Sequence, residues 1–151
     1  MTNNSNEILR LVKHLISAWS LGDVDETMRY MAANIDYFVN VDPRIAPFAA
    51  SAMGAGALRK RLQLLFNTFD IEAFFAKDIK ISDEDPAVAR VNIAYFYRER
   101  TTREYLEGRF RFIIRFEDGK ITQIEEIHDS SYVEAFARLV GMMRHSTDGT
   151  T

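Results

Sequence analysis

The stretch that decides the fold is RFRFIIRFEDGKITQIEEI, residues 109–127. Up to Phe116 its apolar residues mostly alternate with charged ones, which is the two-residue period of a strand with one buried face. Asp118-Gly119 then separates this run from a second one. Asp-Gly between alternating runs is the strongest short-range signal for a tight hairpin turn. The stretch therefore predicts two antiparallel strands, at about 104–116 and 121–128.

Further elements extend this hairpin towards the N-terminus. The two-residue period also covers about 71–81 and 87–99, and a β-rich run spans 35–41. Residues 43–56 hold prolines and glycines and predict a long loop. Helical spacing of apolar residues predicts helices from Ile8 to Trp19, at about 23–31, at about 57–69 and after Ser131.

This order of elements predicts one α+β domain. The chain contains neither internal repeats nor a linker, so we expect a single domain over residues 1–151, with an ordered core at about 5–145. An antiparallel sheet of this kind buries one face under helices and leaves the other to solvent or a partner.

The turns also predict which strand residues pair. With Asp118-Gly119 as the turn, Phe116 pairs with Ile121, and a regular ladder continues to Gly108 opposite Asp129. A turn at Thr101-Thr102 likewise places Leu106 beside Tyr97 and Gly108 beside Tyr95. Because alternate residues share a face, the helix-covered concave face is expected to carry Tyr95, Tyr97, Gly108, Phe110, Phe112, Ile114, Phe116, Gln123, Glu125 and Asp129. The outer face is expected to carry Phe96, Arg109, Arg111, Ile113, Arg115, Ile124, Glu126 and His128.

Composition excludes several classes of function. The formal net charge is −3 and the basic residues are interspersed with acids, which argues against nucleic acid as a partner. The chain has no cysteine, which excludes disulfides, thiolate metal sites and cysteine nucleophiles. His14, His128 and His145 are scattered, so no metal site with histidine spacing is expected. No apolar run reaches membrane-spanning length and no secretory signal is visible, so we expect a cytoplasmic protein.

Two short motifs carry a resemblance to a known superfamily. Gly22-Asp23 after the first helix and Phe116-Glu117-Asp118-Gly119-Lys120-Ile121 at the last hairpin, in this order of elements, resemble the SnoaL-like, nuclear-transport-factor-2-like superfamily. The resemblance covers residues 5 to 135. It implies a cone-shaped, strongly curved, mostly antiparallel sheet whose concave face is covered by three helices around an apolar pocket. The superfamily includes polyketide cyclases, ketosteroid isomerase and dehydratases, and it hosts many different activities.

The resemblance also implies a site. In SnoaL-type cyclases the strand after the Gly-Lys-Ile turn ends in an acid–base aspartate, and counting along this chain places it at Asp129. The family's Glu-His-Trp run is replaced here by Gln123-Ile124-Glu125. Ketosteroid isomerase fits poorly, because Leu15 stands where its helix-one tyrosine would be and Phe112 lies near its protonated aspartate.

Each candidate residue also has a structural interpretation. Asp129 is a proton-transfer group in an apolar pocket or the cap of the last helix. Glu125 shares a proton with it or pairs with an arginine, and Tyr95 orients a substrate oxygen or fills a strand. His128 is expected on the face opposite Asp129. The residues expected to bind a ligand are Trp19, Tyr37, Asp42, Tyr97, Gly108, Phe110, Phe112 and Gln123.

Two functions remain open from the sequence. One is an enzyme that uses no cofactor and performs acid–base cyclisation, isomerisation or dehydration on a hydrophobic cyclic or polyketide-like molecule, with Asp129 as acid–base group and Glu125 or Tyr95 assisting. The other is a non-catalytic ligand-binding or dimerisation module that uses the same pocket. In either case we expect a homodimer through the outer sheet face around Ile113 and Ile124, with no nucleic acid or membrane partner.

Overall fold

The computed structural model describes residues 5–142 as four α-helices, a short 3-10 helix and six strands. In chain order these are α1 (Ser5–Ser20), α2 (Val24–Met28), β1 (Met31–Val39), η1 (Pro47–Ala49), β2 (Ala52–Met53), α3 (Ala55–Thr68), β3 (Phe69–Ile81), β4 (Val88–Glu99), β5 (Tyr105–Glu117), β6 (Lys120–His128) and α4 (Ser130–Leu139). The predicted core can be followed from residue 5 to 142, and residues 143–145, with His145, lie outside the described residues.

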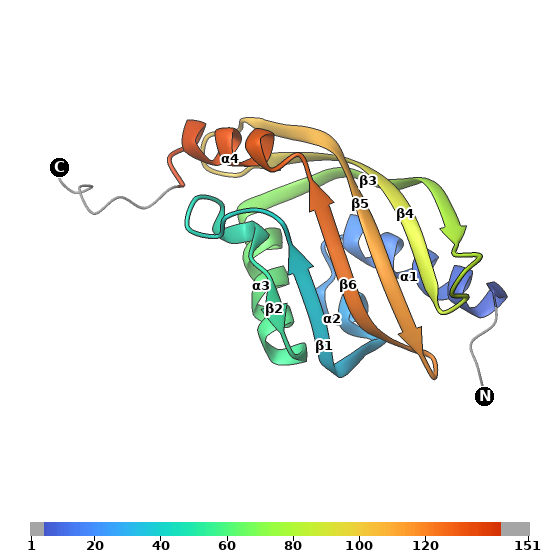
Figure 1. Cartoon of the computed structure of the whole chain (residues 1–151). Coiled ribbons are helices and arrows are strands. Elements are labelled where there is room, and N and C mark those ends of the chain that lie inside the picture. Colours follow the sequence, from blue (N-terminus) through green and yellow to red (C-terminus); the bar gives the residue numbers. More distant parts are fainter. Residues whose placement is uncertain (1–4, 143–151) are drawn as a thin grey trace.

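The strands form one curved sheet in the order β2-β1-β6-β5-β4-β3. All neighbours are antiparallel except β1 and β6, which run parallel. The helices α1, α2 and α3 lie together on one side of the sheet, and α4 lies at one end (Figure 1). The prediction of an α+β fold with a mostly antiparallel sheet under helices is confirmed.

The helices cover the concave face because each presents an apolar stripe. In α1 the stripe runs from Ile8 to Trp19, and both residues are fully buried. In α3 the buried face consists of Leu58, Arg61, Leu62, Leu65 and Phe66. Spacings of three and four residues place these side chains on one side of a helix. The single charge among them, Arg61, belongs to the site described below.

The predicted long loop contains two short elements. The helix η1 lies within residues 43–56, and β2 pairs antiparallel with β1 through Asp36 with Met53 and Tyr37 with Ala52. The backbone N–H of Gly54 donates to the Ile35 carbonyl at 2.7 Å and ends this pairing. A strand of two residues is too short for the pattern analysis to detect.

The hairpin between β5 and β6 begins as predicted. Asp118 and Gly119 have φ angles of 51° and 77°, as a turn with two left-handed residues requires, and Glu117 pairs with Lys120. The register between β4 and β5 is also confirmed, with Tyr95 opposite Gly108 and Tyr97 opposite Leu106.

The rest of the β5–β6 register is wrong in the prediction, because β6 contains a bulge. Phe116 pairs with Ile121, but Arg115 pairs with Gln123, so Thr122 is an extra residue without a partner in the ladder. From there on Ile114 lies opposite Ile124, Phe112 opposite Glu126 and Phe110 opposite His128. One extra residue exchanges the two faces of a strand. Glu126 and Ile124 are therefore buried with exposed fractions of 4% and 0%, whereas Glu125 and Ile127 lie on the outer face.

The bulge makes a prediction about deletions. Removal of Thr122 restores a regular ladder without moving Ile121 or Ile124, so the loss in unfolding free energy should be about 1–2 kcal/mol. Removal of Glu125 turns Glu126 and His128 outward and leaves buried Arg61 without its carboxylate, which should cost at least about 3 kcal/mol. Chemical denaturation of the two deletion variants measures both losses. Equal losses would contradict the role given to Thr122.

Candidate functional site

A buried carboxylate, that of Glu126 on β6, lies at the centre of the site. It accepts hydrogen bonds from the Tyr37 hydroxyl and from Arg61 Nη2, which lies 3.2 and 3.3 Å from its two oxygens. His128 Nε2 lies 2.5 Å from Glu126 Oε2. The side chains of Arg61, Glu126 and His128 are at most 7% exposed. We refer to Tyr37, Arg61, Glu126 and His128 as the Glu126 cluster.

Three elements bring the cluster together. The Thr122 bulge turns Glu126 and His128 to the concave side, and they are two residues apart on one face of β6. The parallel pairing of β1 with β6 places Tyr37 opposite Ile124. Arg61 points inward because it lies on the apolar stripe of α3, three residues after Leu58.

The electrostatics of the cluster favour an ionised Glu126. Burial alone would raise the pKa of its carboxyl, but the Arg61 guanidinium and the hydrogen bond from His128 lower that pKa to about 2. Burial likewise opposes the charge of Arg61, and the Glu126 carboxylate outweighs it and raises the pKa of Arg61 above its ordinary value. Burial and the neighbouring carboxylate raise the pKa of Tyr37, which therefore remains a neutral donor.

Two nitrogen atoms of the cluster have no hydrogen-bond partner among the described residues. Within residues 5–142, Arg61 Nη1 and His128 Nδ1 are buried and form no hydrogen bond. Arg61 Nε donates to the Ala50 carbonyl at 3.1 Å, and the guanidinium lies 5.0 Å from the centre of the Tyr37 ring. Because His128 Nε2 faces a carboxylate, the neutral tautomer protonated at Nε2 carries its lone pair on Nδ1. An unpartnered basic nitrogen in an apolar interior is a candidate proton acceptor.

Aromatic rings surround the cluster on the concave face. The ring of His128 lies 4.6 Å from that of Phe110 and 6.1 Å from that of Tyr95, centre to centre. Trp19 Nε1 donates to the Tyr97 hydroxyl at 3.1 Å. The structure thus brings together the predicted ligand-binding residues Trp19, Tyr37, Tyr97, Phe110 and Phe112, along with Tyr95. Burial raises the pKa of both Tyr95 and Tyr97, so these phenols stay neutral.

Gly108 lies beside Tyr95, as predicted, but not opposite Asp129. A Cβ atom at Gly108 would stand 3.3 Å from Tyr95 Oη and 3.4 Å from the Tyr132 ring, which is tighter than ordinary contact. The Tyr132 hydroxyl donates to the Glu107 carbonyl at 2.6 Å and ties α4 to β5. The absence of a side chain at Gly108 therefore allows α4 to approach this end of the sheet.

The predicted position of Asp129 on the concave face is wrong. The bulge shifts the register, and Asp129 follows the last residue of β6 as the exposed N-cap of α4, where its carboxylate accepts from the Tyr132 backbone N–H at 3.4 Å. This is the cap interpretation of the sequence pattern.

Three other expected site residues lie neither in the Glu126 cluster nor among the aromatic rings around it. Gln123 and Glu125 line a hollow of about 240 Å³ on the outer face, so their predicted concave position is wrong for the same reason as that of Asp129. Asp42 forms an ion pair with Arg44 at 2.9 Å, and this hydrogen bond lowers the pKa of the Asp42 carboxyl.

The sequence contained a signal for the residues that the prediction missed. Ile121, Ile124 and Ile127 are three residues apart, and a regular strand cannot bury all of them on one face. A bulge between the first two resolves the conflict for Ile121 and Ile124. Arg61 was detectable as the one charge at a buried position of a helical stripe, where a charge needs a partner.

Two wider findings concern the part of the chain that the structure describes. Residues 5–142 contain no group of three or more His, Asp or Glu side chains that could share a metal ion. None of the helices in this range is long and apolar enough to cross a membrane.

Comparison with known proteins identifies a family for this chain and solved structures with a similar fold. The SnoaL-like domain profile matches residues 12–124. No curated protein is detectably similar in sequence. Among solved structures, a candidate polyketide cyclase from Xanthomonas campestris has a similar fold, with a TM-score of 0.73 and 16% identity over 89% of this chain and 99% of that one. An NTF2-like protein from Burkholderia xenovorans has a TM-score of 0.68 and 21% identity over 91% of this chain and 97% of that one. The Δ5-3-ketosteroid isomerase from a Mycobacterium species is also similar, with a TM-score of 0.69 and 14% identity over 83% of this chain and 95% of that one. At these identities the likeness concerns the fold alone.

The low pKa of Glu126 predicts a specific dependence of stability on pH. Its pKa is about 2 in the folded chain, below its ordinary value of 4.5. The ionised carboxylate therefore stabilises the fold fully above about pH 4.5, and this contribution is lost as pH falls towards 2. The difference in unfolding free energy between the wild type and Glu126→Gln should shrink by roughly 3 kcal/mol between pH 6 and 2. Denaturation at a series of pH values measures it. Glu125→Gln removes the neighbouring carboxylate and is the control. If the difference in unfolding free energy between the wild type and Glu125→Gln shrank equally over the same pH range, the assignment to Glu126 would be contradicted.

Proposed function

The chain belongs to the SnoaL-like domain family, and on this premise we propose that it is a small-molecule enzyme of the isomerase and cyclase kind. Its proposed chemistry is acid–base proton transfer without a cofactor, in a cyclisation, isomerisation or dehydration. The observation that carries the proposal is the buried His128–Glu126 pair, in which Nε2 faces the carboxylate and Nδ1 has no partner within residues 5–142. A histidine oriented in this way by a carboxylate is a common form of general base.

Each member of the Glu126 cluster has a role in the proposed reaction. His128 Nδ1 takes a proton from the substrate and returns it to another substrate atom, so the enzyme ends as it began. Glu126 fixes the orientation of the imidazole and stabilises its protonated form. Arg61 and Tyr37 keep Glu126 ionised through their hydrogen bonds. Arg61 Nη1 is available to donate to a substrate oxygen that gains negative charge.

The surroundings of His128 favour a hydrophobic substrate with a ring. Tyr95 and Phe110 are 3% and 5% exposed and lie against the imidazole. Apolar rings of this kind bind cyclic molecules by burial and stacking. The names of two neighbours in the comparisons, a candidate polyketide cyclase and a ketosteroid isomerase, point to molecules whose class fits this description. We propose a hydrophobic cyclic or polyketide-like substrate. We also propose that the protein is cytoplasmic.

A second candidate function is a non-catalytic ligand-binding or dimerisation module. One observation favours it: the side chains of Trp19, Tyr37 and Phe112 are at most 1% exposed, and the Trp19 ring packs 5.5 Å from that of Phe112. Side chains thus occupy much of the concave side. In this function the Glu126 cluster would be a structural ion-pair network that fixes the packing of α3 on β6.

We further propose that two copies of the chain pair through the outer face of the sheet. The patch predicted from the sequence is wrong in one member, because Ile124 is buried on the concave face. A different apolar pair lies on the outer face of β1 and β2, where Phe38 is 47% and Met53 70% exposed. Phe38 and Asp36 share a face of β1, and Asp36 pairs with Met53. An apolar patch that meets its own copy across a two-fold axis is self-complementary.

The catalytic proposal predicts the effect of removing His128. Hydrophobic cyclic ketones and polyketide analogues would be screened for turnover, and His128→Gln should then lower kcat about 10²–10⁴-fold while ligand binding is retained. His14→Gln, which removes a histidine bonded to the Glu26 carbonyl, should keep full activity. Asp129→Asn should also keep it, because asparagine caps a helix nearly as well.

The outcomes separate the two functions. Full activity in His128→Gln would contradict the role of His128, and a loss confined to Asp129→Asn would assign it to the aspartate that the family resemblance implies. Ligand binding without turnover by the wild type would favour the binding module.

The dimer proposal predicts a mass of two chains by light scattering at micromolar concentration. Phe38→Lys should shift the protein towards one chain. Phe75→Lys is a matched control, since Phe75 is 49% exposed on β3, at the other end of the sheet. A wild-type mass of one chain, or equal effects of both variants, would rule out this interface.

A further inference from the structure

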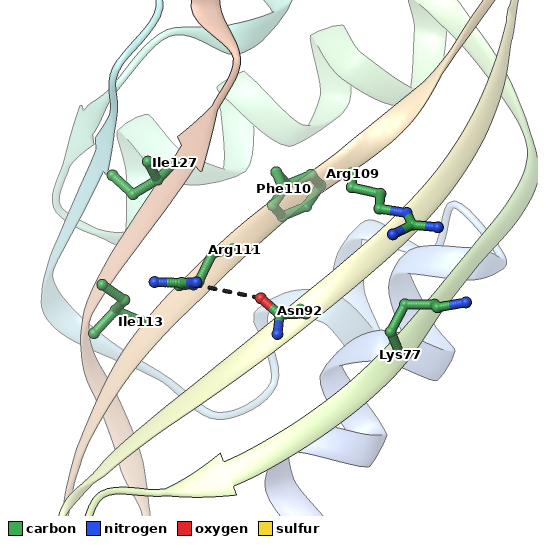
Figure 2. Close-up of a pocket in the computed structure, with 7 residues that line it drawn as sticks. All are labelled: Lys77, Asn92, Arg109, Phe110, Arg111, Ile113 and Ile127. Atoms are coloured by element: carbon green, nitrogen blue, oxygen red, sulfur yellow. Dashed lines mark hydrogen bonds between the residues drawn. The ribbon is translucent and has the colours of Figure 1, made fainter.

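A second hollow, of about 710 Å³, lies on the outer face of the sheet, away from the Glu126 cluster. Four strands contribute to it: Lys77 comes from β3, Asn92 from β4, Arg109, Phe110, Arg111 and Ile113 from β5, and Ile127 from β6 (Figure 2). Its volume falls in the range of small-molecule sites, about 300–1,000 Å³. Apart from Phe110, whose ring packs against His128, these residues take no part in the proposed reaction or in the proposed dimer patch.

The pairing of the strands explains why the face is hollowed here. Arg109 lies opposite Ala94 and Arg111 opposite Asn92, so short side chains alternate with long ones across β4 and β5. A second irregularity, between Ala76 and Asp78, leaves Lys77 without a partner in the β3–β4 ladder. The long basic side chains therefore surround a depression in the sheet surface, and Ile113 and Ile127 supply apolar side chains to its lining.

The basic residues of this hollow are not neutralised within the described part of the chain. Among the described residues, none of Lys77, Arg109 and Arg111 forms an ion pair with a carboxylate, and Arg111 Nε donates only to Asn92 Oδ1 at 3.3 Å. Other arginines of the same strands do have such partners: Arg98 pairs with Glu72 at 3.4 Å and Arg115 with Asp85 at 2.9 Å. Three positive charges gathered within one concavity repel one another, and a bound anion relieves that repulsion.

We propose that this hollow binds a small organic anion, with a carboxylate or phosphate head group held by Arg109, Arg111 and Lys77 and an apolar body against Ile113 and Ile127. Guanidinium groups present two parallel N–H donors that match the oxygens of either head group. The amide of Asn92 fixes the Arg111 side chain, and Asn92 Nδ2 itself donates to Asp78 Oδ1 at 2.7 Å. A positioned arginine loses less conformational freedom when it binds.

The surroundings of the hollow favour a small ligand over a polymer or an extended acidic segment. Asp78 lies at the β3 side, and Glu125 lies opposite Ile113 on the β6 side. These carboxylates limit the positive region to the hollow itself. Nucleic acid or an acidic peptide needs a longer basic stripe than this, in a chain whose formal net charge is −3.

Four probes separate the two parts of the proposed ligand. Hexanoate and hexyl phosphate carry a head group and an apolar body, inorganic phosphate carries the head alone, and hexanol the body alone. Titrations of the full chain, followed by backbone amide shifts in NMR, should show that at least one of the first two probes binds at least tenfold more tightly than the last two. Its shifts should centre on the amides of residues 109–113. The tighter of hexanoate and hexyl phosphate identifies the head group.

Charge variants locate the site. Arg109→Gln and Arg111→Gln should each weaken binding of that probe about tenfold or more, because each removes a charge-assisted hydrogen bond. Arg115→Gln removes the same charge from the same strand at a residue already paired with Asp85, and should weaken binding less than about twofold. All three side chains lie at the surface or partly so, and circular dichroism checks that each variant folds.

Several results would overturn the proposal. Equal weakening in Arg115→Gln would show a diffuse attraction of anions to the surface. If inorganic phosphate bound as tightly as hexyl phosphate and hexanoate, the proposed apolar part of the ligand would be wrong. If no probe bound at millimolar concentration, the proposed site would be wrong. A change of mass in light scattering for Arg111→Gln, without a change in probe affinity, would show that a second copy of the chain occupies the hollow.

Discussion

The burial of one carboxylate constrains much of this structure. Glu126 has an exposed fraction of 4%, and an ionised group at such a position is tolerated only if other groups replace the water it has lost. Arg61 from α3, Tyr37 from β1 and His128 from β6 supply that replacement, so the helix layer and the neighbouring strands β1 and β6 meet at one point. A change in the relative position of any of the three elements would leave a charge buried without its partner, which makes the arrangement mutually dependent.

The sequence predicted most elements of the fold, because their signals are local. The apolar stripe of α1, the alternation in β4 and β5 and the Asp118-Gly119 turn each depend on a few neighbouring residues, and the structure confirms them. The ends of β1 and the short β2 were not predicted, because their pairing depends on contacts between segments distant in the chain.

The candidate site was predicted only in part, for a different reason. The residues placed correctly on the concave face, such as Tyr95 and Phe112, lie on strands whose alternation is regular. The residues on β6 were assigned to the wrong face because alternation was extended through a bulge, and Glu126 and His128 were expected outside. Strand periodicity transmits one local error to every later residue of the strand.

The bulge at Thr122 also has an evolutionary consequence. Substitutions change the interior of a protein one side chain at a time, but the gain or loss of one codon in β6 after the bulge, such as that of Glu125, replaces the whole inward set of residues after it by the outward set. In this chain the two alternating sets are Glu126 and His128, and Glu125 and Ile127. Related chains can thus exchange the chemistry of the concave face in a single genetic event while the hairpin, the helices and the rest of the core stay as they are. Alignments that forbid a gap inside this strand will therefore compare residues that face opposite sides of the sheet.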